Sequence, residues 1–279
     1  MELPQKIFKF LDDFNEFRDS SEYSFYIFLK ENRTIVSILQ GNYSDLIREV
    51  DYHNNPRFDD IHWHETSKLR WQLQRKVIRV LSNYLSSICW VVDFSRKNSR
   101  KYLEPNPNCL AEFDKGIKQN FATNLTHRFI QDLRNYINHK DFIKITTIKK
   151  VTDSNIDRNI FISKKQLLSA SFSWNSKAKE FINQQNEEIY LIDLLMLHFK
   201  KFIDFQNSIY LSIIRSDLNL TTNLISRLEN FHTQAKALNT AYILPFDGVY
   251  IRYLKYLQNY SIQHGLVTPN NESIISGIT

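Results

Sequence analysis

Apolar side chains recur at helical spacing along most of the chain. The first such stripe runs from Pro4 to Arg18 and predicts an N-terminal helix. Three longer stripes predict the main helices of the fold, at residues 67–94, 108–140 and 175–214. Pro105 and Pro107 precede the second of these helices, for which Asn108 is the expected N-cap. The chain is therefore expected to be mostly helical.

Two segments depart from the helical pattern. Tyr23–Gln40 mixes β-branched and aromatic residues, so it fits either two strands or a broken helix, and both alternatives stay open. In Phe142–Ile148 and Asn159–Ser163 the period changes to two around a polar turn. We therefore expect a small β-hairpin at residues 142–163, inserted into an otherwise helical chain.

The C-terminal part predicts two shorter helices. Asp217 is the expected N-cap of one, which runs to about Leu238, and Asp247 caps another that Gly265 can end. Together the patterns predict an all-α helical bundle with a hairpin insertion. We expect an N-terminal accessory segment at residues 1–65, a helical domain at residues 66–265 and a frayed tail at residues 266–279.

Composition supports a helical, soluble reading of the chain. Only 5 Gly and 6 Pro occur in 279 residues, too few for the tight turns of a sandwich, a propeller or a doubly wound sheet. Two cysteines cannot form a disulfide framework, and no apolar run approaches the length of a membrane helix. The N-terminus lacks the apolar core of a signal peptide, so a cytoplasmic protein without a membrane partner is expected.

Several chemistries are excluded because their motifs are missing. The sequence contains no glycine-rich phosphate loop, GxSxG, HExxH or CxxC motif. Cys89, beside Trp90 on a predicted helix, is expected to be a small buried side chain rather than a nucleophile. A metal-dependent hydrolase remains a distant alternative, based on a cluster of possible ligands at Asp59, Asp60, His62, His64 and Glu65. Such sites need further ligands downstream, so we expect neither a metal nor another cofactor.

The most informative motif is Leu133–His139 (LRNYINH), near the end of the second long helix. Arg134 is followed by Asn135 and, four positions further on, by His139. Arginine and histidine occur at similar spacing elsewhere in the chain, but only here does Asn follow the Arg. At about 100° per residue the apolar residues of this segment point to the core. One flank is then left to the polar side chains of Arg134, Asn135, Asn138 and His139.

Positive charge surrounds this motif. The chain as a whole has 36 Lys and Arg against 30 Asp and Glu, a net charge of +6. Residues 140–165 alone hold seven Lys or Arg against three Asp, so much of the excess lies next to Arg134 and His139. His127, two turns before Arg134, lies on nearly the same line of the helix. A phosphate backbone is expected to be attracted to this region.

The motif resembles the signature of the HEPN superfamily, in which an Arg, often followed by Asn, precedes a His by four to six positions. The resemblance implies an up-and-down helical bundle that pairs through its motif helices. It also implies a metal-independent RNA endonuclease, found in toxin–antitoxin and phage-defence systems. Arg134 would hold the scissile phosphate, His139 would move a proton and Asn135 would orient one of them. The RNA-binding residues would be His127, Asn138, Lys140, Lys144, Lys149 and Lys150.

Two other readings of the motif stay open. Arg134 and His139 could simply cover a solvated helix end, where basic residues offset the helix dipole. Alternatively, the same face could serve a non-catalytic interaction module that joins two protomers or binds an antitoxin-like or defence-system protein. The expected partners are thus RNA, a second copy of the chain and such a protein.

Overall fold

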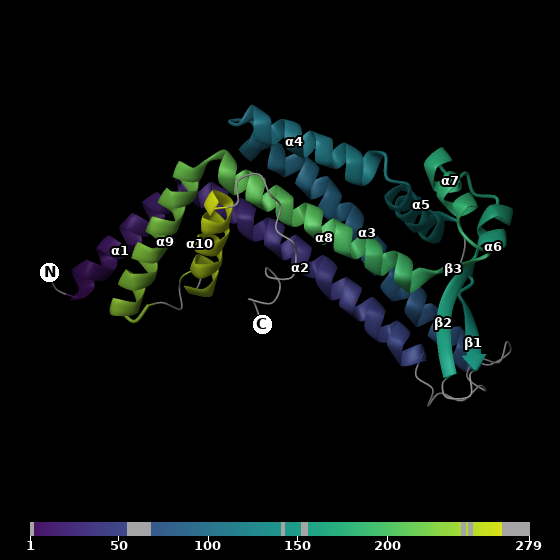
Figure 1. Ribbon diagram of the computed structural model, residues 1–279. Coiled ribbons are helices and arrows are strands. Elements are labelled where there is room, and N and C mark those ends of the chain that lie inside the picture. The colour runs from purple at the N-terminus through teal and green to yellow at the C-terminus, as the bar shows by residue number, and fades with distance from the viewer. Residues whose placement is uncertain are drawn as a thin grey trace. The chain divides into compact units, whose positions relative to one another are not determined.

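The computed structural model describes residues 3–54, 68–140, 143–151, 156–240, 244 and 248–263 (Figure 1). Its described part is helical except for one small antiparallel sheet, so the expectation of an all-α protein with a small β insertion is confirmed. The chain divides into two compact units. The first is assembled from three separate stretches of the chain and the second from two. The helices α2 (Ser21–Asn54), α3 (Lys68–Leu103), α4 (Pro107–Ile117) and α8 (Leu191–Ser216) each contribute residues to both units.

The first unit comprises the described parts of Met1–Arg33, Ser95–Asp114 and Gln206–Thr279. It contains α1 (Leu3–Arg18), α9 (Leu218–Ala237) and α10 (Gly248–Gln263), which lie side by side in Figure 1. Phenylalanine rings join α1 to α9: the rings of Phe14 and Phe17 have their centroids 5.4 and 5.2 Å from that of Phe231. Aromatic pairs at this spacing add to the stability gained from burial.

The second unit comprises Thr34–Phe94 and Lys115–Phe205. It holds the π-helix η2 (Lys118–Ala122), α5 (Leu125–His139), α6 (Lys164–Ser169) and α7 (Ser176–Gln184). Its core joins α2, α3 and α8 through Tyr43, whose ring stacks on Phe199 at 3.9 Å and lies 5.6 Å from Tyr84. The motif helix α5 belongs to this unit.

A three-stranded sheet follows α5 in the chain, with β1 (Thr146–Val151), β2 (Ile156–Ser163) and β3 (Glu188–Tyr190) in the order β1-β2-β3. Thr146 pairs with Phe161 in the first antiparallel ladder, and Phe161 pairs with Tyr190 in the second. The predicted hairpin is confirmed, although its first strand begins later than expected. β3 was not predicted, because three residues are too few to establish a period of two.

Four predictions about helices differ from the structure, and a local cap explains one of them. Residues 23–40 form part of the continuous α2 instead of strands or a broken helix, and α3 continues past residue 94 to Leu103. The predicted helix 108–140 is divided into α4, η2 and α5, with the break between η2 and α5. Asn106, not Asn108, caps α4, because its side chain accepts from the Cys109 N–H while Pro107 occupies the first helical position.

The predicted helix 175–214 is also divided, into α7, β3 and α8. Its expected start is confirmed by the N-cap Asn175, whose side chain accepts from the Lys177 N–H at 3.0 Å. Likewise Asp217 caps α9 by accepting from the Leu220 N–H at 2.8 Å. The expected cap Asp247 and the stop at Gly265 lie outside the described residues.

Within the described part of the chain, the stretch Gln74–Leu103 of α3 is long and apolar enough to cross a membrane by length and composition alone. The expectation that no run approaches this length is therefore corrected. More than half of the relevant window is buried inside the fold, with Leu81, Tyr84 and Leu85 fully inaccessible. A core helix of a folded unit has the same property, so this finding is weak evidence for a membrane span.

Candidate functional site

The helix α5 is strongly two-sided, as its sequence predicts. Phe129, Ile130 and Leu133 are completely buried, and Tyr136 is 2% exposed. The motif's polar residues lie on the remaining arc of the helix: Asn138 and His139 are exposed, whereas Arg134 and Asn135 are partly buried. The sequence-based division of α5 into a core face and a polar flank is therefore observed.

Arg134 lies on the side of α5 that faces α3. Its charge acts on the thiol of Cys89, and Asn138, one turn further along α5, accepts a hydrogen bond from the Ser82 hydroxyl at 3.2 Å. The later residue of α5, Asn138, thus lies near the earlier residue of α3, Ser82, and Arg134 lies near Cys89. The two helices therefore run in opposite directions. The Arg134 Nε is buried and has no hydrogen-bond partner among the described residues.

His139 ends the last turn of α5 and is exposed to solvent. Five positions separate it from Arg134, which places the two side chains about 140° apart around the helix and their Cα atoms about 9 Å apart. The described residues show no hydrogen bond between Arg134 and His139. The two side chains thus lie on opposite borders of the polar arc, with Asn135 between them.

On another side, α5 contacts the segment that directly precedes α7. The Asp132 carboxylate accepts from the Asn175 N–H at 2.6 Å, and the Tyr136 ring stacks on Trp174 with centroids 5.6 Å apart. Trp174 also donates from its indole nitrogen to the Leu167 carbonyl at 2.9 Å. These contacts fix the rotation of α5 about its axis, and with it the direction of the polar arc.

The four lysines predicted to bind RNA lie in the chain that follows α5. Lys140 and Lys144 are exposed next to the end of α5. Lys149 and Lys150 lie on β1, where they pair in register with Arg158 and Asp157 of β2. The exposed Lys140 and Lys144 give positive charge to the chain that follows the C-terminal end of α5.

His127 is not part of this surface. Its side chain is completely buried, with its ring centroid 4.6 Å from that of Phe121. Its Nδ1 lies 3.1 Å from Nε2 of His198, a residue of α8 that is 6% exposed. Burial lowers the pKa of both imidazoles well below 6.5, so the pair is neutral near neutral pH. The prediction that His127 extends the polar flank fails because α8 covers that position.

Two tryptophans on α3 are exposed, and neither was predicted as a site residue. Trp90, 46% exposed, directly follows Cys89, and Trp71 is 60% exposed with the Arg75 guanidinium 4.8 Å from its ring centroid. Trp71 stands between Arg70 and Gln72, which was an available signal of exposure, whereas Trp90 stands between Cys89 and Val91 and carries no such signal. Cys89 itself is partly buried, and burial raises its pKa, which agrees with an unreactive thiol.

The candidate metal ligands Asp59, Asp60, His62, His64 and Glu65 lie outside the described residues. Among the residues that are described, no group of three or more His, Cys, Asp or Glu side chains could hold a metal ion. Comparison of the chain with protein-family models, curated proteins and solved structures finds no match.

The start of α5 depends on a single side chain. Asn124 is the N-cap, and its Oδ1 accepts from the His127 N–H at 2.9 Å directly after the π-helix. We expect Asn124→Ala to lower the free energy of unfolding by about 1 kcal/mol, because the N–H loses its acceptor. Urea denaturation checks this, with Asn124→Asp as the control that keeps an acceptor. Equal stability of the alanine variant and the wild type would contradict the assignment.

Proposed function

We propose that the polar arc of α5 cleaves RNA without a metal ion, using Arg134 and His139 as catalytic residues. The observation that carries the proposal is the position of Arg134. Its guanidinium is partly buried against α3 and leaves Nε without a hydrogen-bond partner in the described structure, whereas an arginine that only covers a helix end is fully solvated. A guanidinium whose Nε–H the described residues leave unpaired is suited to binding a phosphate group.

Exposed aromatic side chains on α3 add support. Trp90 follows Cys89, the residue whose thiol senses the Arg134 charge, so an indole lies on the helix that borders the polar arc. Unpaired bases stack on such rings, and cations next to them attract the backbone. Lys140 and Lys144 supply positive charge at the other end of the arc.

The separation of Arg134 and His139 favours an active site shared by two copies of the chain. Side chains that diverge by about 140° on one helix are poorly placed to contact the same phosphodiester from one side. If two α5 helices pair about a two-fold axis, His139 of one copy approaches Arg134 of the other. An isologous interface of this kind repeats the arrangement and creates two equivalent sites.

In this site each motif residue has a separate task. Arg134 holds the scissile phosphate and stabilises the charge that develops on it. His139 takes the proton from the attacking 2′-hydroxyl or gives one to the leaving 5′-oxygen, because an imidazole changes charge near neutral pH. Asn135, between them on the arc, orients one of these groups by a hydrogen bond. The products are a 2′,3′-cyclic phosphate and a free 5′-hydroxyl.

The test is to incubate the purified chain with single-stranded RNA in excess EDTA and to identify the ends that form. We expect cyclic phosphate ends, and no cleavage of DNA of the same sequence, which lacks the 2′-hydroxyl. A defence or toxin–antitoxin setting in the cytoplasm is part of the proposal. RNA that stays intact with a chain that still forms a dimer would favour the non-catalytic interaction module instead.

A further inference from the structure

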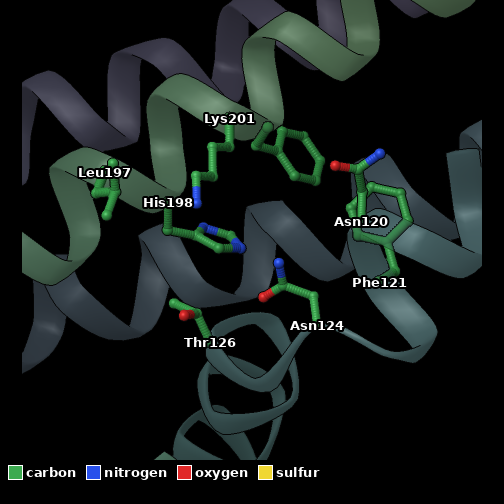
Figure 2. A pocket seen from close by; sticks show the side chains of 8 residues that line it. Asn120, Phe121, Asn124, Thr126, Leu197, His198 and Lys201 are labelled. Atoms are coloured by element: carbon green, nitrogen blue, oxygen red, sulfur yellow. The ribbon is translucent and has the colours of Figure 1, made fainter.

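A small cavity lies at the N-terminal end of α5, away from the motif at the other end of the helix. It is lined by Asn120 of η2, Asn124 and Thr126 at the start of α5, and His198 and Lys201 of α8, together with apolar side chains. Figure 2 shows Lys201 extending from α8 toward the His198 ring, with the amide of Asn124 on the opposite side of the space. The cavity measures about 20 Å³, room for one water-sized group.

The geometry of the two buried histidines shows how they interact. Their rings are nearly coplanar at 19°, and their centroids are 5.4 Å apart although Nδ1 of His127 and Nε2 of His198 are only 3.1 Å apart. The centroid separation equals the nitrogen distance plus the two ring radii, so the rings meet edge to edge in a nearly linear N–H···N hydrogen bond. A metal ion bound to both nitrogens would need the rings at a steep angle, which this arrangement does not provide.

This hydrogen bond leaves Nδ1 of His198 without a partner. The atom is buried in a side chain that is only 6% exposed, and the residue lines the cavity. A buried polar atom without a partner is costly unless a ligand or water completes it. The opposite nitrogen of the pair, Nε2 of His127, is also unpartnered and completely enclosed.

The other polar groups around the cavity are mostly donors. The Lys201 ammonium lies close enough for its charge to act on His198, and its side chain is exposed. Asn124 uses its Oδ1 to cap α5, which leaves its amide N–H groups free to face the cavity. The first N–H groups of α5 add the positive end of a helix dipole. Asp204, three residues after Lys201 on α8, does not line the cavity, and its charge interacts with that of Lys200.

We propose that this cavity is a binding site for a phosphate group, which inserts one oxygen between His198, Lys201 and the N-terminus of α5. The size of the cavity admits a single oxygen, and the rest of the phosphate stays at the mouth. His198 donates from Nδ1 to that oxygen and accepts at Nε2 from the His127 N–H. Binding therefore fixes one tautomer for both rings. The site is separate from the proposed cleavage site and does not depend on it.

The experiment is a titration of the full chain with inorganic phosphate at pH 7, followed by ¹⁵N NMR of labelled histidines. We expect saturable binding, with the His198 Nδ1 signal moving to the position of a protonated, donating nitrogen. Lys201→Met removes the charge at an exposed position and should weaken binding by about tenfold or more. Lys200→Met, its neighbour on α8 that does not line the cavity, is the matched control and should bind as the wild type does.

A second arm separates the two sources of the phosphate group. A dinucleotide with a 5′-phosphate is compared with the same dinucleotide bearing a 5′-hydroxyl. Tighter binding of the phosphorylated dinucleotide than of both inorganic phosphate and the 5′-hydroxyl dinucleotide supports the site with a nucleic-acid end as its ligand. Equal binding of the phosphorylated dinucleotide and inorganic phosphate supports it with free phosphate, and equal binding of the two dinucleotides overturns it. An unchanged His198 signal, or equal weakening by the two lysine variants, overturns the proposal whether or not the chain cleaves RNA.

Discussion

Arg134→Ala and His139→Ala are each expected to reduce RNA cleavage in EDTA by about 100-fold or more, the usual loss when a charge-stabilising donor or a general acid–base is removed. The matched control is Arg128→Ala, on the same helix six positions before Arg134. Arg128 donates to Gln131 at 2.8 Å and has no role in the proposed chemistry, so its variant should cleave at nearly the wild-type rate. The initial rate of cleavage of a labelled RNA measures all three.

Both motif variants should fold normally, because Arg134 is only partly buried and His139 is exposed. Circular dichroism and the urea midpoint check this separately from activity. Wild-type cleavage by His139→Ala would remove the assignment of this residue. A loss in Arg128→Ala equal to that in Arg134→Ala would show that general charge on α5, and not the motif, determines activity.

Acid is expected to destabilise the protein because of the His127–His198 pair. Burial lowers the pKa of both side chains below the value of 6.5 that they have when unfolded. Below pH 6.5 the unfolded chain therefore binds protons that the folded chain does not, and stability falls as the pH is lowered. Each histidine contributes a slope of up to about 1.4 kcal/mol per pH unit. We expect a loss of about 2–4 kcal/mol between pH 6.5 and 5.

Urea denaturation at a series of pH values measures this loss. Carboxylates change little in charge between pH 6.5 and 5, so the histidines dominate the window. His198→Phe removes one proton-binding group of the pair, and the slope of stability against pH should fall by about half. His127→Phe should have the same effect if the first variant does not fold. A wild-type stability that is independent of pH across this window would contradict the neutral buried pair.

The sequence predicted those features that depend on residues close together in the chain. Caps at Asn175 and Asp217, the stripe of α5 and the change of period at the hairpin are all local, and all are observed. The interruption between η2 and α5 was missed because the apolar stripe continues across it from Phe121 to Phe129, while the Asn124 cap resembles any polar residue on a helix surface. An apolar stripe indicates which side chains are buried. It does not indicate whether the backbone hydrogen bonds of the helix continue.

The candidate site was likewise predictable only in the features that depend on residues close together in the chain. The direction of Arg134 relative to the core follows from helical periodicity, but its contact with α3 does not, since Cys89 lies 45 residues away. His127 was assigned to the wrong environment for this reason. Its partner, His198, is 71 residues distant and carries no local signal. The proposed phosphate site depends on that pair and could not be predicted from the sequence.

The most direct test of a cleavage site shared by two copies is to mix the Arg134→Ala and His139→Ala variants, each inactive alone. In a mixed pair, one of the two sites combines an intact Arg134 with an intact His139 from the other copy. We predict that mixing restores cleavage to roughly a quarter of the wild-type rate, the share expected from random exchange of subunits in a two-fold assembly. No activity in the mixture, although the variants exchange partners, would contradict the account.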